Sequence, residues 1–503
     1  MPPARRELQL RQLQRAASGR SKPKPKPKPV LVVRKRLLEL PPELLARIVS
    51  LLPSADDVGR LDCVSHAFHT AGEPPLPSVV EDALRMRRAS TSIPEELPAQ
   101  ELSWTQKLLW DERRLQLGRP AVVAAGAMHS VFIDPSSCLL ICGVYHASAG
   151  FLGHGIDVIR VTEPTAVPSI ADVAIHSVAV RHHHTLAIGA ADGLVYACGR
   201  GDCGRLGNGS EEHAHTPIVV EAMRAVDVRT VSAGRDHSLF SDADGLAYSC
   251  GASANGRLGH GAAEADGNVH VPRLVESLRR VRVCSVAAGD DVSFFLTDRG
   301  RVFSCGVAEH GALGHGGTAD ERLPRVIDAL CAVRVRYISA GRTHALFVGA
   351  AGEVYSCGLG IFGRLGHGHD RKLLVPCRIE ALADVHVTCV AAGEGHSLFV
   401  TSSGSAFSCG WNVNGQCGQS DVAEVATPCQ IESLSNVRGV AAGYAHSLAF
   451  DAEGRVFGWG NGADECLGLQ LHGDLPAPME YAQVRVKVAS EWGGRAAPEP
   501  LSA

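Results

Sequence analysis

Short apolar segments separated by turn-forming pairs fill the chain from residue 122 onward. These segments hold three to six residues, alternate partly between apolar and polar positions, and are typical of β-strands; examples are 238–240, 246–250, 396–401 and 405–409. Asp244-Gly245, Ser403-Gly404 and Glu453-Gly454 separate such segments, which favours hairpin turns. No helical period is sustained between residues 122 and 467. This part of the chain is therefore predicted to be all β.

A phrase of the form Ala-Ala-Gly-x-x-His-Ser recurs seven times. Its central position recurs at intervals of 50 to 55 residues, at Gly126, Arg181, Gly234, Gly289, Gly341, Gly393 and Gly443. Two copies depart from the pattern, because Arg181 replaces the glycine and Val292 replaces the histidine. Either departure is explained equally well by drift or by function.

Two further phrases keep the same step. A Cys-Gly or Trp-Gly pair closes a strand-like segment at Cys142, Cys198, Cys250, Cys305, Cys357, Cys409 and Trp459. A Leu-Gly-His-Gly loop or a variant follows, starting at Leu152, Leu206, Leu258, Leu313, Leu365, Cys417 and Leu467. A unit of about fifty residues with several short strands matches a propeller blade, and seven blades would close into a ring that leaves few strand edges exposed. Residues 484–490 resemble the first strand of a repeat and are expected to pair with blade one.

The amino-terminal part has a different pattern. Leucine and isoleucine recur at helical spacing over residues 37–52, after a Pro41-Pro42-Glu43 start that suits the first turn of a helix. A break at Pro53-Ser54 precedes Asp56-Asp57, which can cap a second helix. We therefore expect a small helical module over 37–71 and a helical linker over 72–117.

The charge is divided unevenly along the chain. Residues 1–36 carry twelve Lys or Arg and one Glu, whereas the whole chain has a net charge of −4. Lys-Pro repeats four times over 22–29, which favours an extended, solvated rod. This tail is either a weak nucleic-acid contact or import signal, or simply a solvated tail. We expect disorder over 1–36 and 491–503. With no apolar run of membrane-spanning length and no signal peptide, we expect a cytoplasmic or nuclear protein with no membrane contact and with reduced thiols.

The three phrases and their period resemble the repeat of the regulator of chromosome condensation family. The resemblance covers about 118–490 and implies a seven-bladed propeller. That family includes an exchange factor for the GTPase Ran, a plant UV-B photoreceptor and propellers attached to ubiquitin ligases. In the photoreceptor the first variable position of the phrase carries Trp in several blades. Here it carries Arg235, Asp290, Arg342 and Glu394, so light sensing by that mechanism is not expected.

Residues 37–71 resemble an F-box, with Phe68 where that family commonly has Trp. An F-box docks its apolar face on the Skp-type adaptor of a cullin–RING ubiquitin ligase. The resemblance assigns adaptor contact to Leu40, Pro41, Leu44, Leu45, Ile48, Leu51, Leu52, Val58, Leu61, Val64 and Phe68. The alternative is a helical hairpin that only packs against the propeller. A module this short leaves an apolar stripe that some partner or domain must cover.

Histidine and cysteine are numerous, but they repeat once per blade. A residue spread around a ring does not converge on one centre, so the histidines are predicted to hydrogen-bond turn backbone and the Cys-Gly cysteines to be small buried residues. The chain has no Cys-x-x-Cys pair, P-loop, nucleophile elbow or His-Glu-x-x-His. Three consecutive histidines at 182–184 cannot all point one way on a strand. We predict no catalysis, metal or cofactor.

Two variable residues lie between the Gly and the His of each phrase, and repeat symmetry brings them to one face. We call these fourteen residues the crown: Ala127, Met128, His182, His183, Arg235, Asp236, Asp290, Asp291, Arg342, Thr343, Glu394, Gly395, Tyr444 and Ala445. Arg235, Asp236, Asp290, Asp291, Arg342, Glu394 and Tyr444 are the candidate partner-binding residues. The alternative is an ordinary charged loop surface.

The leading hypothesis is therefore a non-catalytic adaptor. Its F-box-like module would recruit a Skp–cullin ligase, and its propeller would bind a protein substrate. The rival hypothesis is a propeller that exchanges nucleotide on a small Ran-like GTPase or associates with chromatin. That rival hypothesis gives no function to the apolar stripe over 40–52, whereas an F-box requires the stripe to be exposed.

Overall fold

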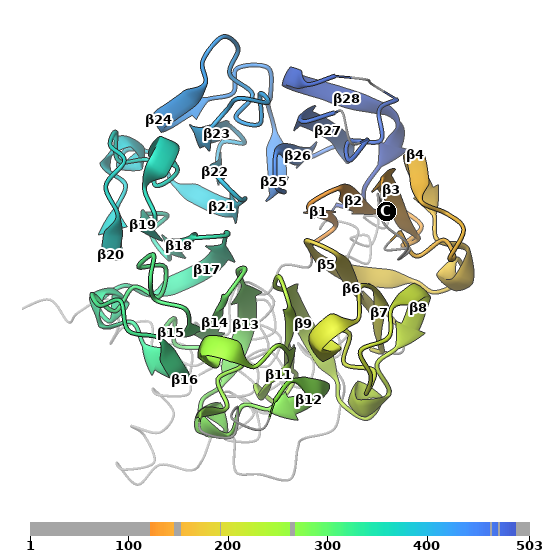
Figure 1. Cartoon of the computed structure of the whole chain (residues 1–503). Helices are drawn as coiled ribbons and strands as arrows, with labels where there is room; N and C mark the ends of the chain where they lie inside the picture. Colours follow the sequence, from red (N-terminus) through yellow and green to blue (C-terminus); the bar gives the residue numbers. More distant parts are fainter. Residues whose placement is uncertain are drawn as a thin grey trace, which may run out of the picture. The chain divides into compact units, whose positions relative to one another are not determined.

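The computed structural model describes residues 121–144, 152–191, 193–261, 267–462, 465–470 and 473–488. Within these ranges, seven four-stranded antiparallel sheets follow one another around a ring (Figure 1). Each sheet uses four strands that are consecutive in the chain, so each repeat builds one complete blade. The predicted seven-bladed propeller is confirmed.

The first four blades run from the inner strand to the outer one. Blade one holds β1 (Val123–Ala125), β2 (His129–Ile133), β3 (Leu139–Val144) and β4 (Arg160–Ala166); blade two holds β5 (Ile175–Arg181), β6 (His184–Gly189), β7 (Val195–Gly199) and β8 (Ala214–Val219). Blade three holds β9 (Val228–Ala233), β10 (His237–Asp242), β11 (Ala247–Gly251) and β12 (Val269–Leu274); blade four holds β13 (Val283–Ala288), β14 (Val292–Thr297), β15 (Val302–Gly306) and β16 (Glu321–Val326).

The last three blades keep the same order. Blade five holds β17 (Val335–Ala340), β18 (His344–Gly349), β19 (Val354–Gly358) and β20 (Leu373–Arg378); blade six holds β21 (Val387–Ala392), β22 (His396–Thr401), β23 (Ala406–Trp411) and β24 (Glu424–Gln430). Blade seven holds β25 (Val437–Ala442), β26 (His446–Asp451), β27 (Arg455–Gly460) and β28 (Leu475–Arg485).

Helical turns in the described ranges are three-residue 3-10 helices of two kinds. One kind follows the outer strand and buries an apolar residue under the blade: η1 (Pro168–Ile170), η3 (Glu221–Met223), η6 (Glu276–Leu278), η7 (Asp328–Leu330) and η9 (Glu380–Leu382). The other kind lies in the glycine loop: η2 (Asp202–Gly204), η4 (Ala254–Gly256) and η8 (Ile361–Gly363). None of the helices in these ranges is long and apolar enough to cross a membrane.

The core lies between neighbouring sheets. The second strand of blades three to six is buried at every residue, and it contributes the fully buried rings of Phe240, Phe294, Phe347 and Phe399. The outer strand β16, in contrast, has only half-buried and exposed positions. This gradient explains the sequence pattern, because inner strands have apolar neighbours on both faces and outer strands on one.

A glycine and a proline meet at each pair of neighbouring blades, and in most pairs a cysteine lies beside them; between blades six and seven, Gly418 lies against Trp459 instead. Gly259 of blade three has a φ of +77°, and a Cβ there would lie 2.9 Å from Pro324 Cδ and 3.3 Å from Cys305 Sγ in blade four. Only glycine combines this backbone with so close an approach. The Cys-Gly cysteines are buried, as predicted. The described cysteines are all free thiols.

The repeated histidine forms a second joint between blades. Its Nε2 lies 2.9–3.2 Å from the hydroxyl oxygen of the next blade's Ser or Thr, in the pairs His129–Thr185, His184–Ser238, His237–Ser293, His344–Ser397, His396–Ser447 and His446–Ser130. In five of these blades the hydroxyl also donates to a backbone carbonyl of the histidine's own blade, as Ser447 does to Gln416 at 2.7 Å. The prediction that these histidines bond turn backbone is therefore wrong, because their side-chain partners lie one blade further on.

The seventh joint, between blades four and five, is apolar. Val292 stands in place of the histidine and Ala345 in place of the serine, and both are buried. The two replacements belong together, since either polar partner alone would be buried without a hydrogen bond. The carbonyl of Ala312, which the serine would have bonded, lies 3.3 Å from Cys357 Sγ.

The glycine-loop histidines also bond side chains. Nε2 of His260, His315 and His367 lies 2.9–3.0 Å from a serine hydroxyl of the same blade. The prediction of backbone contacts holds for His154, whose Nδ1 lies 2.6 Å from the Leu152 carbonyl oxygen.

Blades one and seven close the ring through the same joints. His446 meets Ser130, and the Tyr444 amide donates to the Gly126 carbonyl at 3.1 Å. The expected pairing with blade one is wrong for residues 484 and 485, which belong to β28 in blade seven, and residues 489–490 lie outside the described residues. The end of blade seven and the residues after it still contact blade one, because the Lys487 amide donates to the Ile133 carbonyl and the Tyr481 ring packs edge-on against Phe132.

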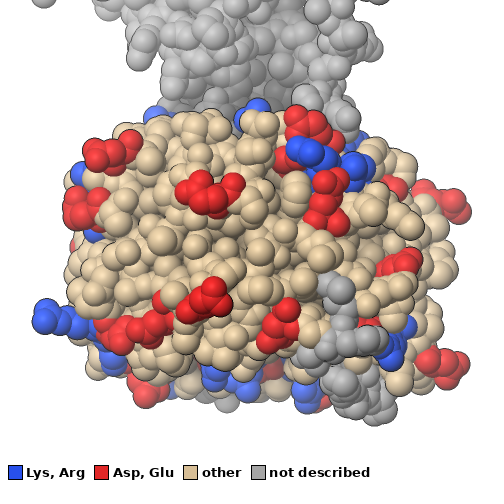
Figure 2. Space-filling model, turned by 90° about the horizontal axis from the view of Figure 1, so that it is seen from above, with Lys and Arg blue, Asp and Glu red and all other residues tan. Residues whose placement is uncertain are grey.

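Charges of both signs are scattered over the side of the propeller that Figure 2 shows. Acidic side chains are spread over this surface and basic ones are interspersed with them. The basic tail, the F-box-like module, the linker and the carboxyl-terminal tail lie outside the described residues.

The histidine joint predicts how two variants should differ in stability. Ser447→Ala leaves His396 Nε2 buried without its partner, which should lower the free energy of unfolding by about 1–3 kcal/mol. The double variant His396→Val/Ser447→Ala copies the Val292–Ala345 joint and should lose less. Trp459 Nε1 still donates to the Gln416 carbonyl in both variants. Urea unfolding followed by tryptophan fluorescence measures both. A double variant less stable than the single one contradicts this account.

The same joints predict loss of stability in mild acid. Burial lowers the pKa of His129, His237, His396 and His446 to about 3, against about 6.5 in the unfolded chain. The unfolded state therefore binds more protons below pH 6.5. Stability should be constant above that pH and fall as the pH drops toward 3. The double variant lacks one such histidine and should show a shallower slope between pH 6.5 and 5. Equal slopes for the parent protein and the double variant would contradict the assignment of this pH dependence to the buried histidines.

Candidate functional site: the crown of the propeller

The crown residues lie in the turns that join the first and second strands of each blade. In blade three, the Gly234 amide donates to the His237 carbonyl, so Arg235 and Asp236 are the two central residues of a tight turn. A Cβ on Gly234 would lie 2.3 Å from the His237 ring, which explains why glycine precedes the turn. The same geometry in successive blades displays the variable pairs on one face.

Arg181 reaches from blade two to blades four and five. Its Nε donates to Asp290 Oδ1 at 2.8 Å and its Nη1 to the Ala340 carbonyl at 3.1 Å. The side chain is 14% exposed, and that of Asp290 is 3% exposed. The replacement of the repeat glycine by Arg181 therefore has a structural role, because it links blades that do not adjoin.

Asp290 is the centre of a buried charge cluster. His182 Nε2 lies 3.1 Å from its Oδ2, and Arg342 Nε lies 3.9 Å from the same oxygen. Burial by itself would raise the pKa of Asp290, but Arg181 and His182 outweigh it and hold this pKa well below its usual range. Asp290 is therefore an ionised internal anchor. Its side chain is nearly buried and serves the framework, and it also lines the second of the cavities described below.

Arg342, Glu394 and Tyr444 form a more accessible group on blades five to seven. Arg342 Nη1 donates to Glu394 Oε1, and Glu394 raises the pKa of both Arg342 and Tyr444. The side chain of Arg342 is 49% exposed, and Tyr444 is 42% exposed. A guanidinium and a phenol are thus held in place while still facing solvent, which is typical of binding hot spots.

Asp236 and Asp291 neutralise two buried arginines of the glycine loops. Arg205 Nη2 lies 2.7 Å from Asp236 Oδ1, and Arg257 Nη1 lies 2.7 Å from Asp291 Oδ1. Both arginines are buried, whereas about a third of each aspartate side chain is exposed. Arg235 extends beside Asp236 and is half exposed.

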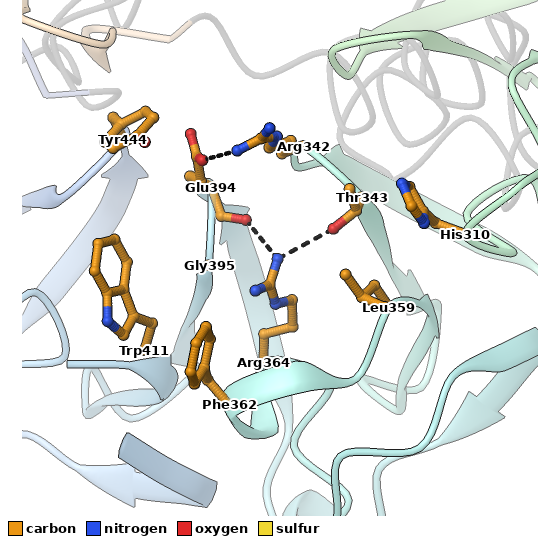
Figure 3. A pocket seen from close by; sticks show the side chains of 10 residues that line it. All are labelled: His310, Arg342, Thr343, Leu359, Phe362, Arg364, Glu394, Gly395, Trp411 and Tyr444. Atoms are coloured by element: carbon orange, nitrogen blue, oxygen red, sulfur yellow. Dashed lines mark hydrogen bonds and ion pairs between the residues drawn. The ribbon is translucent and has the colours of Figure 1, made fainter. Parts of the chain in front are cut away.

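Two cavities open among these residues. One, of about 420 Å³, lies between blades five and six, and Figure 3 shows its lining: His310, Arg342, Thr343, Leu359, Phe362, Arg364, Glu394, Gly395, Trp411 and Tyr444. The other, of about 440 Å³, is lined by His182, His183, Arg200, Asp202, Cys203, Arg205, Arg235, Asp236, Asp290, Arg342, Glu394 and Tyr444. Arg342, Glu394 and Tyr444 border both cavities.

The structure therefore brings most of the candidate residues together. Six of the seven line the second cavity, and Asp291 pairs with Arg257 on the same face. Sequence reasoning missed Arg364, Phe362 and Trp411, which follow from the glycine-loop and Cys-Gly phrases rather than from the crown phrase.

The described residues offer no metal site. No group of three or more His, Cys, Asp or Glu among them is arranged to hold a metal ion. The three consecutive histidines diverge, because His182 turns to Asp290 and His184 to Ser238 of the next blade.

The sequence profile of the RCC1-like domain matches residues 195–494. The ultraviolet-B receptor UVR8 of Arabidopsis thaliana is 30% identical over 371 residues, which cover 73% of this chain and 83% of that protein. Human E3 ubiquitin-protein ligase HERC2 is 34% identical over 72% of this chain, but the match spans 7% of HERC2. The secretion-regulating guanine nucleotide exchange factor of Mus musculus is 29% identical over 62% of this chain and 68% of its own length.

Among solved structures, yeast RCC1 (Prp20) bound to Kap60 matches with a TM-score of 0.62 and 23% identity, over 79% of this chain and 90% of the yeast chain. This likeness shows the fold.

The Arg181–Asp290 link predicts a coupled stability effect. Arg181→Gly restores the usual repeat residue but leaves Asp290 buried with less compensation. It should cost about 3 kcal/mol of unfolding free energy, the lower end for breaking a buried pair, because His182 remains. Arg181→Gly/Asp290→Asn should cost less than the single change. Chemical unfolding of the three proteins measures this. An Arg181→Gly protein as stable as the parent would contradict a buried link.

Proposed function

Because the chain belongs to the RCC1-like domain family, we propose that its propeller is a protein-binding platform and that the whole chain is a non-catalytic adaptor. The F-box-like module over 37–71 recruits a Skp-type adaptor and its cullin–RING ligase, and the crown binds the protein substrate. The observation that carries the proposal is the crown itself. Charged and aromatic side chains from different blades are fixed around two cavities on one face.

The relatives support a binding role for the propeller. They carry names as different as a receptor, an E3 ubiquitin-protein ligase and a nucleotide exchange factor. One blade framework with a variable face suits this range, because new partners require changes only in the crown. HERC2 supports the connection with ubiquitin transfer, although its match to this chain is confined to a small part of its length.

Nucleotide exchange on a small Ran-like GTPase is the second candidate. The similarity to the secretion-regulating exchange factor favours it. Prp20p of Saccharomyces cerevisiae, a propeller of the same fold, has binding properties toward Gsp1p and histones. This candidate uses the propeller and gives no role to the apolar stripe over 40–52. The two proposals therefore differ in whether the module over 37–71 binds a partner.

The basic tail and the location of the protein follow from the same proposal. The Lys-Pro tail makes a weak, salt-dependent contact with nucleic acid, and the protein works in the cytoplasm, the nucleus or both. No membrane contact is included.

Binding of the full chain to a purified Skp-type adaptor tests the leading proposal. The parent protein should bind, and Leu44→Ala/Leu45→Ala/Ile48→Ala should abolish binding, because the three changes remove the centre of the stripe. Glu453→Gln, an exposed change in blade seven, is the matched control and should bind like the parent. Isothermal calorimetry gives the affinities.

Absence of binding by the parent chain would overturn the adaptor proposal. Release of labelled GDP from Ran-like GTPases, measured with the same preparations, then tests the second candidate. Accelerated release by the triple variant and by the parent alike would favour exchange.

A further inference from the structure

Three arginines occupy the same place in the glycine loops of blades two, three and five. Arg205, Arg257 and Arg364 are 2%, 6% and 6% exposed. The Nε of each donates to the carbonyl three residues earlier, at 2.9–3.1 Å. These bonds fix each guanidinium with its Nη groups toward the crown turn of the next blade.

Two of the three guanidinium groups have a carboxylate partner there. Asp236 pairs with Arg205 and Asp291 with Arg257, both at 2.7 Å. The equivalent position beside Arg364 is Gly395. Arg364 Nη1 donates to the Glu394 carbonyl at 2.9 Å and to Thr343 Oγ1 at 3.1 Å, which are both neutral groups. The side-chain carboxylate of Glu394 pairs with Arg342 instead. Arg364 takes part in none of the ion pairs formed among the described residues.

A buried guanidinium without a directly bonded carboxylate is costly, and a carboxylate that docks on it recovers part of this cost. Burial lowers the pKa of Arg364 to about 10, although the more distant Glu394 carboxylate partly offsets this, so the group is still charged at neutral pH. The missing side chain at Gly395 also leaves the space open. A Cβ there would lie 3.1 Å from Trp411 Cβ and 3.6 Å from Arg364 Nη2, inside the cavity of Figure 3.

Aromatic rings form a wall of the same cavity. Phe362 stacks on Trp411 with centroids 6.2 Å apart and planes 28° apart, and Arg364 Cζ lies 5.9 Å from the Phe362 centroid. Phe362 has a φ of 64° and is 39% exposed. Cys203 and Asn255 share this left-handed conformation, so the repeat imposes it, and a bulky aromatic residue is an unusual occupant. An aromatic pair with one exposed ring, Phe362, and one half-buried ring, Trp411, lies beside a cation that has no ion pair among the described residues, and such a surface suits a chain that carries both charges and apolar groups.

We propose that the cavity between blades five and six binds an Asp or Glu side chain of a partner protein, held by the Arg364 guanidinium, with neighbouring apolar groups of the partner on Phe362 and Trp411. The carboxylate takes the place that Asp236 and Asp291 fill elsewhere in the ring. A cavity of about 420 Å³ accommodates one or two side chains of an extended segment. The inference rests on the proposal that the crown is the partner face, and it names the chemistry of the partner.

A single unpaired guanidinium favours a monoanion over a phosphate. The neighbouring Arg342 is already neutralised by Glu394, whose negative charge would repel a second charge on the ligand. A side-chain carboxylate and a chain-terminal carboxylate share the required chemistry, so the test must separate them.

Four peptides test the site on the full chain, three with amidated ends and one with a free carboxyl end. The first has a central glutamate between two leucines and an amidated end; the second carries glutamine and the third phosphoserine in the centre. The fourth has a central glycine and a free terminal carboxylate. Binding is followed by the indole N–H resonance of Trp411 in ¹⁵N-tryptophan-labelled protein, assigned with Trp411→Phe. The glutamate peptide should shift this resonance saturably and bind about tenfold more tightly than the glutamine peptide, from the loss of one charge-assisted bond.

Two variants copied from other blades provide matched controls. Gly395→Asp supplies the internal carboxylate that blades three and four already have. Arg364→Gln places glutamine where Gln416 stands in blade six. Each should remain folded, as judged by thermal unfolding, and each should lose the difference between the glutamate and glutamine peptides. If Gly395→Asp crowds Trp411 and unfolds the blade, Arg364→Gln still decides the question.

Equal affinity for glutamate and glutamine, or a preference that survives Arg364→Gln, would overturn the proposal. Tighter binding of the phosphoserine peptide would overturn the choice of carboxylate, and tighter binding of the free terminus would overturn the side-chain source. Binding to the Skp-type adaptor does not use this cavity. If the parent protein binds the Skp-type adaptor but does not prefer the glutamate peptide, the proposal for this cavity is wrong and the proposed adaptor function stands.

Discussion

The hydrogen bond from each repeated histidine to the next blade's hydroxyl is the interaction on which the ring depends. It joins side chains more than fifty residues apart and is buried in six of the seven joints. Because a buried imidazole must be paired and neutral, the bond fixes the spacing between inner strands and the direction from which each blade approaches the next. The apolar half of the same joint is the glycine loop of each blade, which packs against the proline of the next blade and, in most blades, against its Cys-Gly cysteine.

Because these contacts between blades hold the ring together, the crown residues can vary. In most blades the glycine before the crown turn and the histidine after it carry the structural contacts, so the two residues between them are not required by the joint. Blade four illustrates the freedom. Its joint is apolar, through Val292 and Ala345, and its crown residue Asp290 receives Arg181 from the far side of the ring. A site built from several blades can therefore change its chemistry while the fold persists, which fits a family whose members have different functions.

The sequence was sufficient for the scaffold because the scaffold is repetitive. Seven copies of three phrases predict the blades, the strand boundaries near 396–401, the glycine turns and the buried cysteines. Contacts that occur only once could not be predicted. Arg181 and Asp290 are 109 residues apart, and only the ring brings them together. The phrase alone predicts turn-backbone contacts for the histidines, because a linear phrase does not show which side chains the adjoining blade places beside them.

The candidate site was predicted in its position and only partly in its contents. Repeat symmetry places Arg342, Glu394 and Tyr444 on one face, but Asp290 is buried and belongs to the framework. Arg364 and Phe362 come from a different phrase, and their importance appears only when Gly395 is compared with Asp236 and Asp291 at equivalent positions.

Site-specific photo-crosslinking in living cells tests most directly whether the crown is the partner face. A benzoylphenylalanine at Tyr444 and another at Glu453 place the reactive group before and after β26, at opposite ends of one strand in blade seven. The account predicts discrete crosslinked proteins from position 444, lost when Arg342→Glu changes the adjoining charge, and no such products from position 453. Discrete products from position 453 and none from position 444 would contradict it.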